Sequence, residues 1–372
     1  MEEATKTILV LGAYGHAGSK IVNGLLEKTS FKIVATGRRR DKLDALKKLH
    51  PLERLTTQVL DTSDKQELRQ YVQKTDMVIN AVGPYSMGGF DIAKTILENK
   101  IPYIDLANEQ FHLNSLRKIE DEIRHSGNMV FTGAGQSPGV STLVMIHLAK
   151  MMDEVNTIEM FGVVGRLPTP DQTLGSIMSG TIEAGMDSVT YINGEHVHEK
   201  LGTFIKEETV PKPFGTMKML SFPLNDCILV PETVKCKTVR TLFGLQMEIP
   251  PIIFKIIAFL KPHKRKWAYR LLQKMMKKSV KDNYLMGLKE GFNPGGYMKL
   301  VVNGSKKITG LIKVEDNAIM SSYMPIVIAK NYFTDPKKFG GLLTPAAIYT
   351  FDSFNKELDK LGWKITIDIT ES

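Results

Sequence analysis

A glycine-rich turn near the start of the chain constrains the fold more than any other feature. Residues 8–11 form an apolar run that is typical of a buried parallel strand. Glycines at positions 12, 15 and 18 follow, and helical spacing begins directly after them. Such a strand–turn–helix unit presents unpaired N–H groups and the positive end of the helix dipole to an anion. It predicts a dinucleotide site at Gly12, Ala13, Tyr14, Gly15, His16, Ala17 and Gly18, the alternative being an ordinary glycine-rich βα turn.

Strand and helix signals alternate over the first 140 residues. Short apolar stretches end in polar or glycine-containing turns, and helical patterns separate them. This alternation predicts an α/β fold with a doubly wound parallel sheet of Rossmann type. In such sheets a ligand binds outside the carboxyl ends of the strands. The expected strands after the first cover residues 31–36, 57–60, 76–81, 102–106 and 129–132.

The second half of the chain has a different residue pattern. Strand-like stretches at 157–161, 188–192 and 298–302 are separated by turns with proline and glycine. They predict a second α+β domain with a mixed or antiparallel sheet. We therefore expect a dinucleotide-binding domain over 1–140, a substrate or dimerisation domain over 141–342, and a C-terminal segment, 343–372, that packs back on the first domain.

A basic turn after the second expected strand indicates which dinucleotide binds. Proteins that prefer NAD place an acidic residue about 20 residues beyond the glycines, where it binds the ribose 2′-hydroxyl. Here Arg38 and Arg39 follow Gly37, and a guanidinium pairs well with a 2′-phosphate. NADP(H) is therefore the predicted cofactor, the alternative being a solvated basic turn. Asp61, at the end of the third strand, is expected near the adenine or as a helix cap.

Several motifs, among them 12–18 (GAYGHAG), 80–85 (NAVGPY) and 103–109 (YIDLANE), together resemble those of the saccharopine dehydrogenase-like oxidoreductases. The resemblance implies an NADP-type Rossmann domain and a second α+β domain that covers the nicotinamide. The amino-acid-handling members carry Asp where this chain has Ser137, so a partner for a substrate ammonium is missing. The matching segments are 12–18 (GAYGHAG), 37–38 (GR) with 41–43 (DKL), 80–85 (NAVGPY), 103–109 (YIDLANE) and 135–139 (GQSPG); two more, 179–184 (SGTIEA) and 340–346 (GGLLTPA), resemble the trans-acting enoyl reductase branch.

The turn after the fourth expected strand is the candidate nicotinamide end of the site. Ala81, Val82, Gly83 and Pro84 are expected to contact the cofactor there. Tyr85 follows them and is the candidate catalytic residue, because a phenol can donate a proton after hydride transfer. The alternative is that Tyr85 stacks on the cofactor or packs beneath it.

Polar residues after the fifth and sixth strands are candidates for the substrate cleft. Asp105, Glu109 and Ser137 are expected to orient substrate, and Ser141 and Thr142 are further candidates. For all of these residues, capping of a helix is the alternative. His196 and His198 would share one face of a strand, but no third ligand lies nearby, so we expect no metal site.

The net charge of +9 is concentrated in one unusual segment, residues 250–281. An apolar run there is followed by a cluster of lysines and arginines without an acidic residue. A basic amphipathic segment suits an anionic membrane surface. It would also suit an entrance for a long apolar substrate, or a core or dimer-interface helix with a solvated basic face. No nucleic-acid recognition motif accompanies the charge, so no nucleic-acid partner is expected.

Taken together, these features predict an NADP(H)-dependent oxidoreductase that reduces a polarised C=C (enoyl) or C=N bond of an apolar or lipid-like small molecule. The alternative is a non-catalytic NADP(H) sensor, and a homodimer is a further expectation. The two cysteines are too few for a disulfide scaffold. With no signal peptide recognised at the first residues, we expect a cytoplasmic protein that associates with a membrane or lipid surface.

Overall fold

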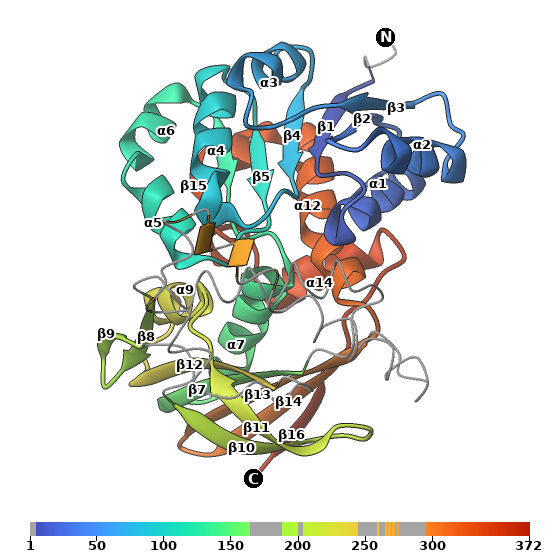
Figure 1. Cartoon of the computed structure of the whole chain (residues 1–372). Helices are drawn as coiled ribbons and strands as arrows, with labels where there is room; N and C mark the ends of the chain where they lie inside the picture. The colour runs from blue at the N-terminus through green and yellow to red at the C-terminus, as the bar shows by residue number, and fades with distance from the viewer. Residues whose placement is uncertain are drawn as a thin grey trace. The chain divides into compact units, whose positions relative to one another are not determined.

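The computed structural model describes residues 5–163, 188–199, 204–244 and 295–372, and isolated positions between 259 and 274. The segment 179–184 and most of the basic segment 250–281 lie outside these residues. The chain divides into two compact units (Figure 1). The first unit contains residues 1–108, 112–140 and 318–363, and the second contains residues 109–111, 141–317 and 364–372.

A seven-stranded parallel sheet forms the centre of the first unit, with helices on both of its faces (Figure 1). The strand order is β15-β6-β5-β4-β1-β2-β3, so the chain reverses direction across the sheet between β1 and β4. This arrangement confirms the predicted doubly wound Rossmann fold. The strands are β1 (Thr7–Leu11), β2 (Lys32–Gly37), β3 (Leu55–Val59), β4 (Met77–Asn80), β5 (Tyr103–Asp105), β6 (Met129–Phe131) and β15 (Gly341–Leu343).

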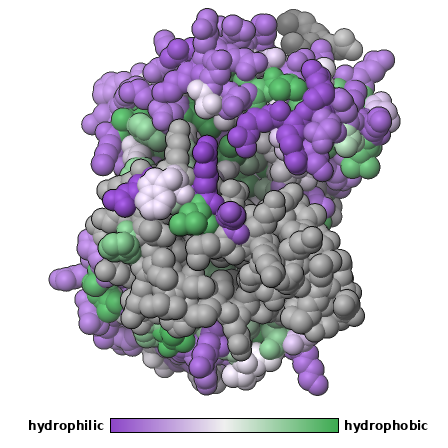
Figure 2. Space-filling model, in the orientation of Figure 1, coloured by the Kyte–Doolittle hydropathy of each residue, from purple (hydrophilic) through white to green (hydrophobic). Residues whose placement is uncertain are grey.

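Burial explains why β1 is an unbroken apolar run. Its residues from Ile8 to Leu11 are fully buried, because helices cover both faces of a parallel sheet. The exposed sides of those helices make the visible surface of the first unit mainly hydrophilic (Figure 2). The covering helices are α1 (His16–Lys28), α2 (Arg40–Leu49), α3 (Lys65–Val72), α4 (Gly89–Glu98), α5 (Gln110–Arg117), α6 (Glu120–Ser126), α12 (Asn317–Thr334) and α14 (Phe351–Asp359).

The C-terminal part of the first unit begins earlier than the predicted boundary at residue 343. Helix α12 belongs to the first unit, where Tyr323 stacks on Trp363 at 5.0 Å between ring centroids. Strand β15 pairs with β6 and adds a seventh strand to the sheet. In contrast, residues 364–372 belong to the second unit, because β16 (Asp368–Glu371) pairs with β14.

The second unit is built on a mixed sheet with the order β10-β11-β12-β7-β13-β14-β16. Strands β12 and β7 are parallel, and the other neighbours along this order are antiparallel. The predicted α+β architecture is therefore confirmed. Its elements are β7 (Val155–Val163), β8 (Val189–Ile192), β9 (Glu195–His198), β10 (Ile205–Val210), β11 (Gly215–Ser221), β12 (Thr238–Gly244), β13 (Gly296–Gly304), β14 (Lys307–Val314), α7 (Ser141–Ala149) and α9 (Asp226–Thr233).

Candidate functional site

At its three glycines, the turn between β1 and α1 is packed too closely for a side chain. Gly12 has φ +73°, and a Cβ atom there would lie 2.9 Å from the Ala81 carbonyl oxygen. A Cβ atom on Gly15 would lie 3.0 Å from the Gly12 carbonyl oxygen, and one on Gly18 would collide with that same oxygen. Each glycine therefore meets a steric need, which is the arrangement expected of a turn whose backbone approaches a ligand.

The N-terminus of α1 opens directly from this turn. Gly15 is the N-cap and has no side chain to satisfy the first amides. The first i→i−4 hydrogen bond of the helix joins the Ser19 N–H to the Gly15 carbonyl at 3.0 Å. The amides of Ala17 and Gly18 lie before this bond, at the open end of the helix. No acidic residue lies in the first helical turn. Such a terminus favours an anion.

The basic turn lies beside the glycine turn, because hydrogen bonds connect the glycine turn to β2 and to Arg39. The Ala13 N–H donates to the Thr36 carbonyl at 2.9 Å, and the Arg39 N–H donates to the Tyr14 hydroxyl at 3.1 Å. The side chains of Arg38 and Arg39 are exposed. Two guanidinium groups are therefore available next to the predicted diphosphate site.

Asp61 lies on the other side of the basic turn, just after β3. The Ser63 N–H and hydroxyl donate to Asp61 Oδ1 at 3.0 and 2.8 Å. These bonds, with a smaller contribution from the Arg38 charge, lower the pKa of Asp61 from 3.8. The cap of α3 is Asp64, whose side chain accepts from the amides of Gln66 and Glu67. A contact between Asp61 and adenine stays a prediction.

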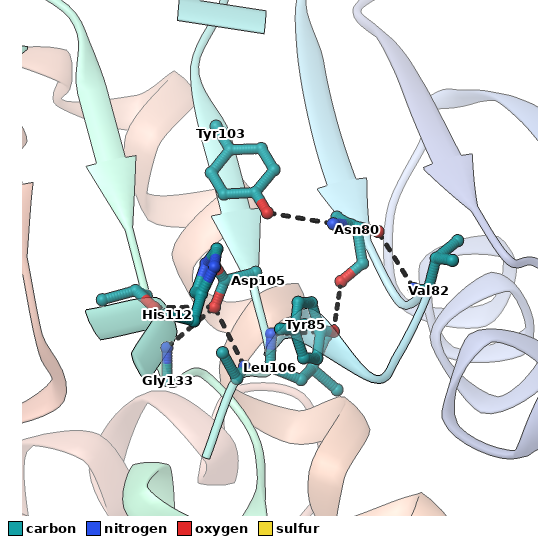
Figure 3. A network of polar contacts seen from close by, with 10 residues as sticks. Asn80, Val82, Tyr85, Tyr103, Asp105, Leu106, His112 and Gly133 are labelled. Carbon is teal, nitrogen blue, oxygen red and sulfur yellow. Dashed lines mark hydrogen bonds and ion pairs between the residues drawn. The ribbon is translucent and has the colours of Figure 1, made fainter. Parts of the chain in front are cut away.

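The end of β4 is shaped by Asn80, which sequence reasoning did not select as a site residue. Its Nδ2 donates to the Tyr103 hydroxyl at 3.0 Å, and its Oδ1 accepts from the Val82 N–H at 2.9 Å (Figure 3). The Ala81 N–H donates to the Leu11 carbonyl, so the turn is anchored to β1 as well. Gly83 is exposed and Pro84 half-buried beyond it. Their contacts with a cofactor stay predictions.

Tyr85 is buried beneath this turn rather than exposed at its surface. Its hydroxyl donates to the Asn80 carbonyl at 2.8 Å and accepts from the Leu106 N–H at 3.3 Å (Figure 3). These bonds join the ends of β4 and β5, which is a structural role. The packing alternative raised for this residue therefore has direct support, and a role as proton donor stays a prediction.

Asp105 is part of a fully buried network and is not exposed for contact with a substrate (Figure 3). One carboxylate oxygen accepts from the amides of Ala107 and Gly133 and from the Thr132 hydroxyl. The other faces His112 Nε2 at 2.8 Å. Burial alone raises the pKa of Asp105, but the His112 charge and these hydrogen bonds outweigh it, so the pKa is lowered. Asp105 thus joins β5, β6 and α5, and its expected contact with substrate stays a prediction.

The remaining cleft candidates are distributed between the two units. Ser137 is half-buried in the first unit, before α7. Glu109 is buried and assigned to the second unit. Ser141 and Thr142 are fully buried at the start of α7, where their hydroxyls donate to Asp226 Oδ1 at 2.5 and 2.8 Å. These two hydroxyls thus join α7 to α9, and substrate contacts of Ser137, Glu109, Ser141 and Thr142 stay predictions.

Within the described ranges, no group of three or more His, Cys, Asp or Glu side chains is placed to hold a metal ion. His196 and His198 lie on β9, and both are exposed. No helix in these ranges combines the length and the apolar composition needed to span a bilayer.

Comparison with known proteins finds a family model that matches part of the first unit. Residues 8–131 match the model of the saccharopine dehydrogenase NADP-binding domain. The curated lipid droplet localized protein of Caenorhabditis elegans is 24% identical over 211 residues, which are 52% of this chain and 49% of that protein. The chain thus matches about half the length of this relative.

A solved structure resembles the whole fold. Apo saccharopine dehydrogenase (L-Glu forming) from Saccharomyces cerevisiae matches with a TM-score of 0.64 and 16% identity. The match covers 99% of this chain and 100% of the yeast chain. At this identity the likeness establishes the two-domain fold alone. Residues 8–131 are therefore similar to the NADP-binding domain of the saccharopine dehydrogenases.

Proposed function

We propose that this protein is an NADP(H)-dependent oxidoreductase. The proposal depends on one observation. The glycine turn before α1 and the basic turn after β2 lie next to each other at one edge of the sheet. The amides of Ala17 and Gly18 would bind the diphosphate, and Arg38 would bind the 2′-phosphate. When bound, the cofactor supplies a hydride at its nicotinamide ring. Gly83 and Pro84 would orient that ring at the end of β4.

We further propose that the substrate is an apolar or lipid-like molecule with a polarised C=C or C=N bond. Ser137 supports this proposal, because it leaves no carboxylate at the position where amino-acid-handling relatives carry one. The name of the nematode relative, which refers to lipid droplets, also favours a substrate of this class. The competing function is an NADP(H) sensor without turnover.

Two measurements test the proposal. Calorimetry measures the binding of NADPH and NADH, and the protein is then mixed with NADPH and enoyl or imine acceptors to detect oxidation. We expect NADPH to bind more tightly than NADH, and NADPH absorbance to fall with an enoyl acceptor. Tight binding with no oxidation in any mixture would favour the sensor. Absence of binding to either nucleotide would contradict both functions.

Arg38→Ala should weaken NADPH binding about 10- to 100-fold and change NADH binding less than about twofold, since a charge-assisted bond to phosphate is worth roughly 1.5–3 kcal/mol. Calorimetry with both nucleotides measures the ratio. Arg124→Ala is the matched control, because Arg124 is an exposed arginine of the same unit whose partners are Glu120 and Asp121. Equal losses for both nucleotides would show that Arg38 does not read the 2′-phosphate.

We also propose that the basic segment 250–281 binds an anionic lipid surface, on the strength of its composition and of the nematode relative's name. Replacement of Lys274, Lys277 and Lys278 by Glu should then reduce binding to vesicles that contain phosphatidylserine at least tenfold, at about 1 kcal/mol per basic residue. Sedimentation with vesicles measures the bound fraction, and neutral vesicles are the control. Failure of the unmodified protein to bind anionic vesicles would exclude this surface.

A further inference from the structure

Tyr14 connects the glycine turn to the basic turn in a way that neither motif predicts. It lies between Gly12 and Gly15, and its ring packs directly over Gly37 at the end of β2. A Cβ atom on Gly37 would collide with the Tyr14 ring, so the absence of a side chain there lets the ring pack against the strand end. The ring is therefore held in place beside Arg38 and Arg39.

The hydroxyl and the ring of Tyr14 both contact Arg39. The hydroxyl oxygen accepts the Arg39 N–H at 3.1 Å, and the guanidinium carbon lies 5.8 Å from the ring centroid. The second distance is within the range of a cation–π interaction. Arg39 is the N-cap residue of α2 and has no side-chain cap of its own. Tyr14 thus fixes the backbone at the start of α2 and restrains the guanidinium above it.

The O–H group of Tyr14 has a hydrogen-bonding capacity that these contacts do not use. A phenol can donate one hydrogen bond while its oxygen accepts another. Here the oxygen accepts from Arg39, and no hydrogen bond among the described residues uses the Tyr14 proton as a donor. The side chain is half-buried, so this donor is accessible at the basic turn.

We propose that Tyr14 is a specificity-determining residue, whose O–H donates a hydrogen bond to the 2′-phosphate of NADP(H) while its ring holds Arg39 in position. The inference rests on the proposed function and extends it. A 2′-phosphate carries close to two negative charges at neutral pH, and a donor that is already oriented binds it at little entropic cost. The Tyr14 hydroxyl would thus bind the 2′-phosphate together with the guanidinium groups of Arg38 and Arg39.

Tyr14→Phe tests the proposal, because it removes the hydroxyl and keeps the ring over Gly37. The probes are NADPH, NADH, 2′,5′-ADP and 5′-AMP, which separate the 2′-phosphate from the nicotinamide. We expect binding of NADPH and 2′,5′-ADP to weaken about tenfold, the scale of one hydrogen bond to a charged group, and binding of NADH and 5′-AMP to change less than about twofold. Tyr71→Phe is the control, because it removes a hydroxyl whose bond to Gln58 spans 3.5 Å.

A second measurement tests the proposed hydrogen bond between the Tyr14 hydroxyl and the 2′-phosphate. In ³¹P spectra of bound 2′,5′-ADP, the pKa of the 2′-phosphate should be lower in the unmodified protein than in Tyr14→Phe, because a donated hydrogen bond stabilises the dianion. Equal weakening of all four probes, an unchanged preference, or an unfolded variant would each overturn the role of Tyr14. If the unmodified protein binds none of the probes, the proposed function itself fails.

Discussion

Gly18→Ala is expected to abolish measurable NADPH binding at micromolar concentrations. The added methyl group would overlap the Gly12 carbonyl oxygen, so α1 and the glycine turn must move apart. Both colliding groups are backbone, and no side-chain rotation can relieve the overlap. Since the diphosphate site consists of amides from this turn and helix, we expect affinity to fall more than about 100-fold, or roughly 2.7 kcal/mol.

The same variant should also lose about 2 kcal/mol of unfolding free energy, because helix α1 is displaced from its packing on β1. Calorimetry with NADPH and urea denaturation measure the two effects. Gly340→Ala is the matched control, since a Cβ atom there meets nothing within 4 Å. If Gly18→Ala binds NADPH as the unmodified protein does, the glycine turn is not the diphosphate site.

The parallel sheet could be predicted from the sequence because its signals are local. Each central strand is a short apolar run followed by a turn and an amphipathic helix, as in the unit from β1 to α1. The seventh strand, β15, could not be found in this way. It has three residues, Gly341–Leu343, and its strand conformation depends on pairing with β6, which is more than 200 residues earlier in the chain.

The domain boundary was misplaced for a related reason. Helix α12 is apolar on most of its surface, and its composition does not indicate which unit it packs against. Its membership of the first unit is a property of tertiary packing, seen in the contact of Ile326 with Gly24 of α1. Only a pattern with one clear polar face would have oriented it from the sequence.

The candidate site was predictable where it depends on backbone and less predictable where it depends on buried side chains. The glycine turn could be identified from spacing, and the position of the basic turn followed from the strand order. The role of Asp105 could not, because it depends on His112 reaching back from α5 to the end of β5. The sequence does not show whether the side chain of an acidic residue after a strand faces a ligand or the protein interior.

Asp105→Asn is the second change for which we expect a large effect, a loss of about 3 kcal/mol of unfolding free energy. The amide oxygen of Asn can still accept from Ala107, Thr132 and Gly133, but its NH₂ group would face His112 Nε2. The charged ring of His112 carries a proton on both nitrogens, so its Nε2–H would then have no acceptor. A ring that lost this proton to accept from the Asn NH₂ group would keep the proton on Nδ1, which is buried without a hydrogen-bond partner among the described residues. Either form of the ring therefore leaves a buried donor unsatisfied.

The lowered pKa of Asp105 also predicts how the free energy of unfolding changes with pH. Because the folded-state pKa of Asp105 is lowered from 3.8, its contribution to stability is complete above about pH 4 and is lost as the pH falls through the folded-state pKa. The unmodified protein should therefore lose stability on acidification more steeply than Asp105→Asn, which lacks this titrating group. Urea denaturation at pH 7 and at steps below pH 4 measures both curves, and Asp121→Asn, a change at an exposed carboxylate, is the control. Parallel curves for Asp105→Asn and the unmodified protein would show that the buried carboxylate does not stabilise the ends of β5 and β6.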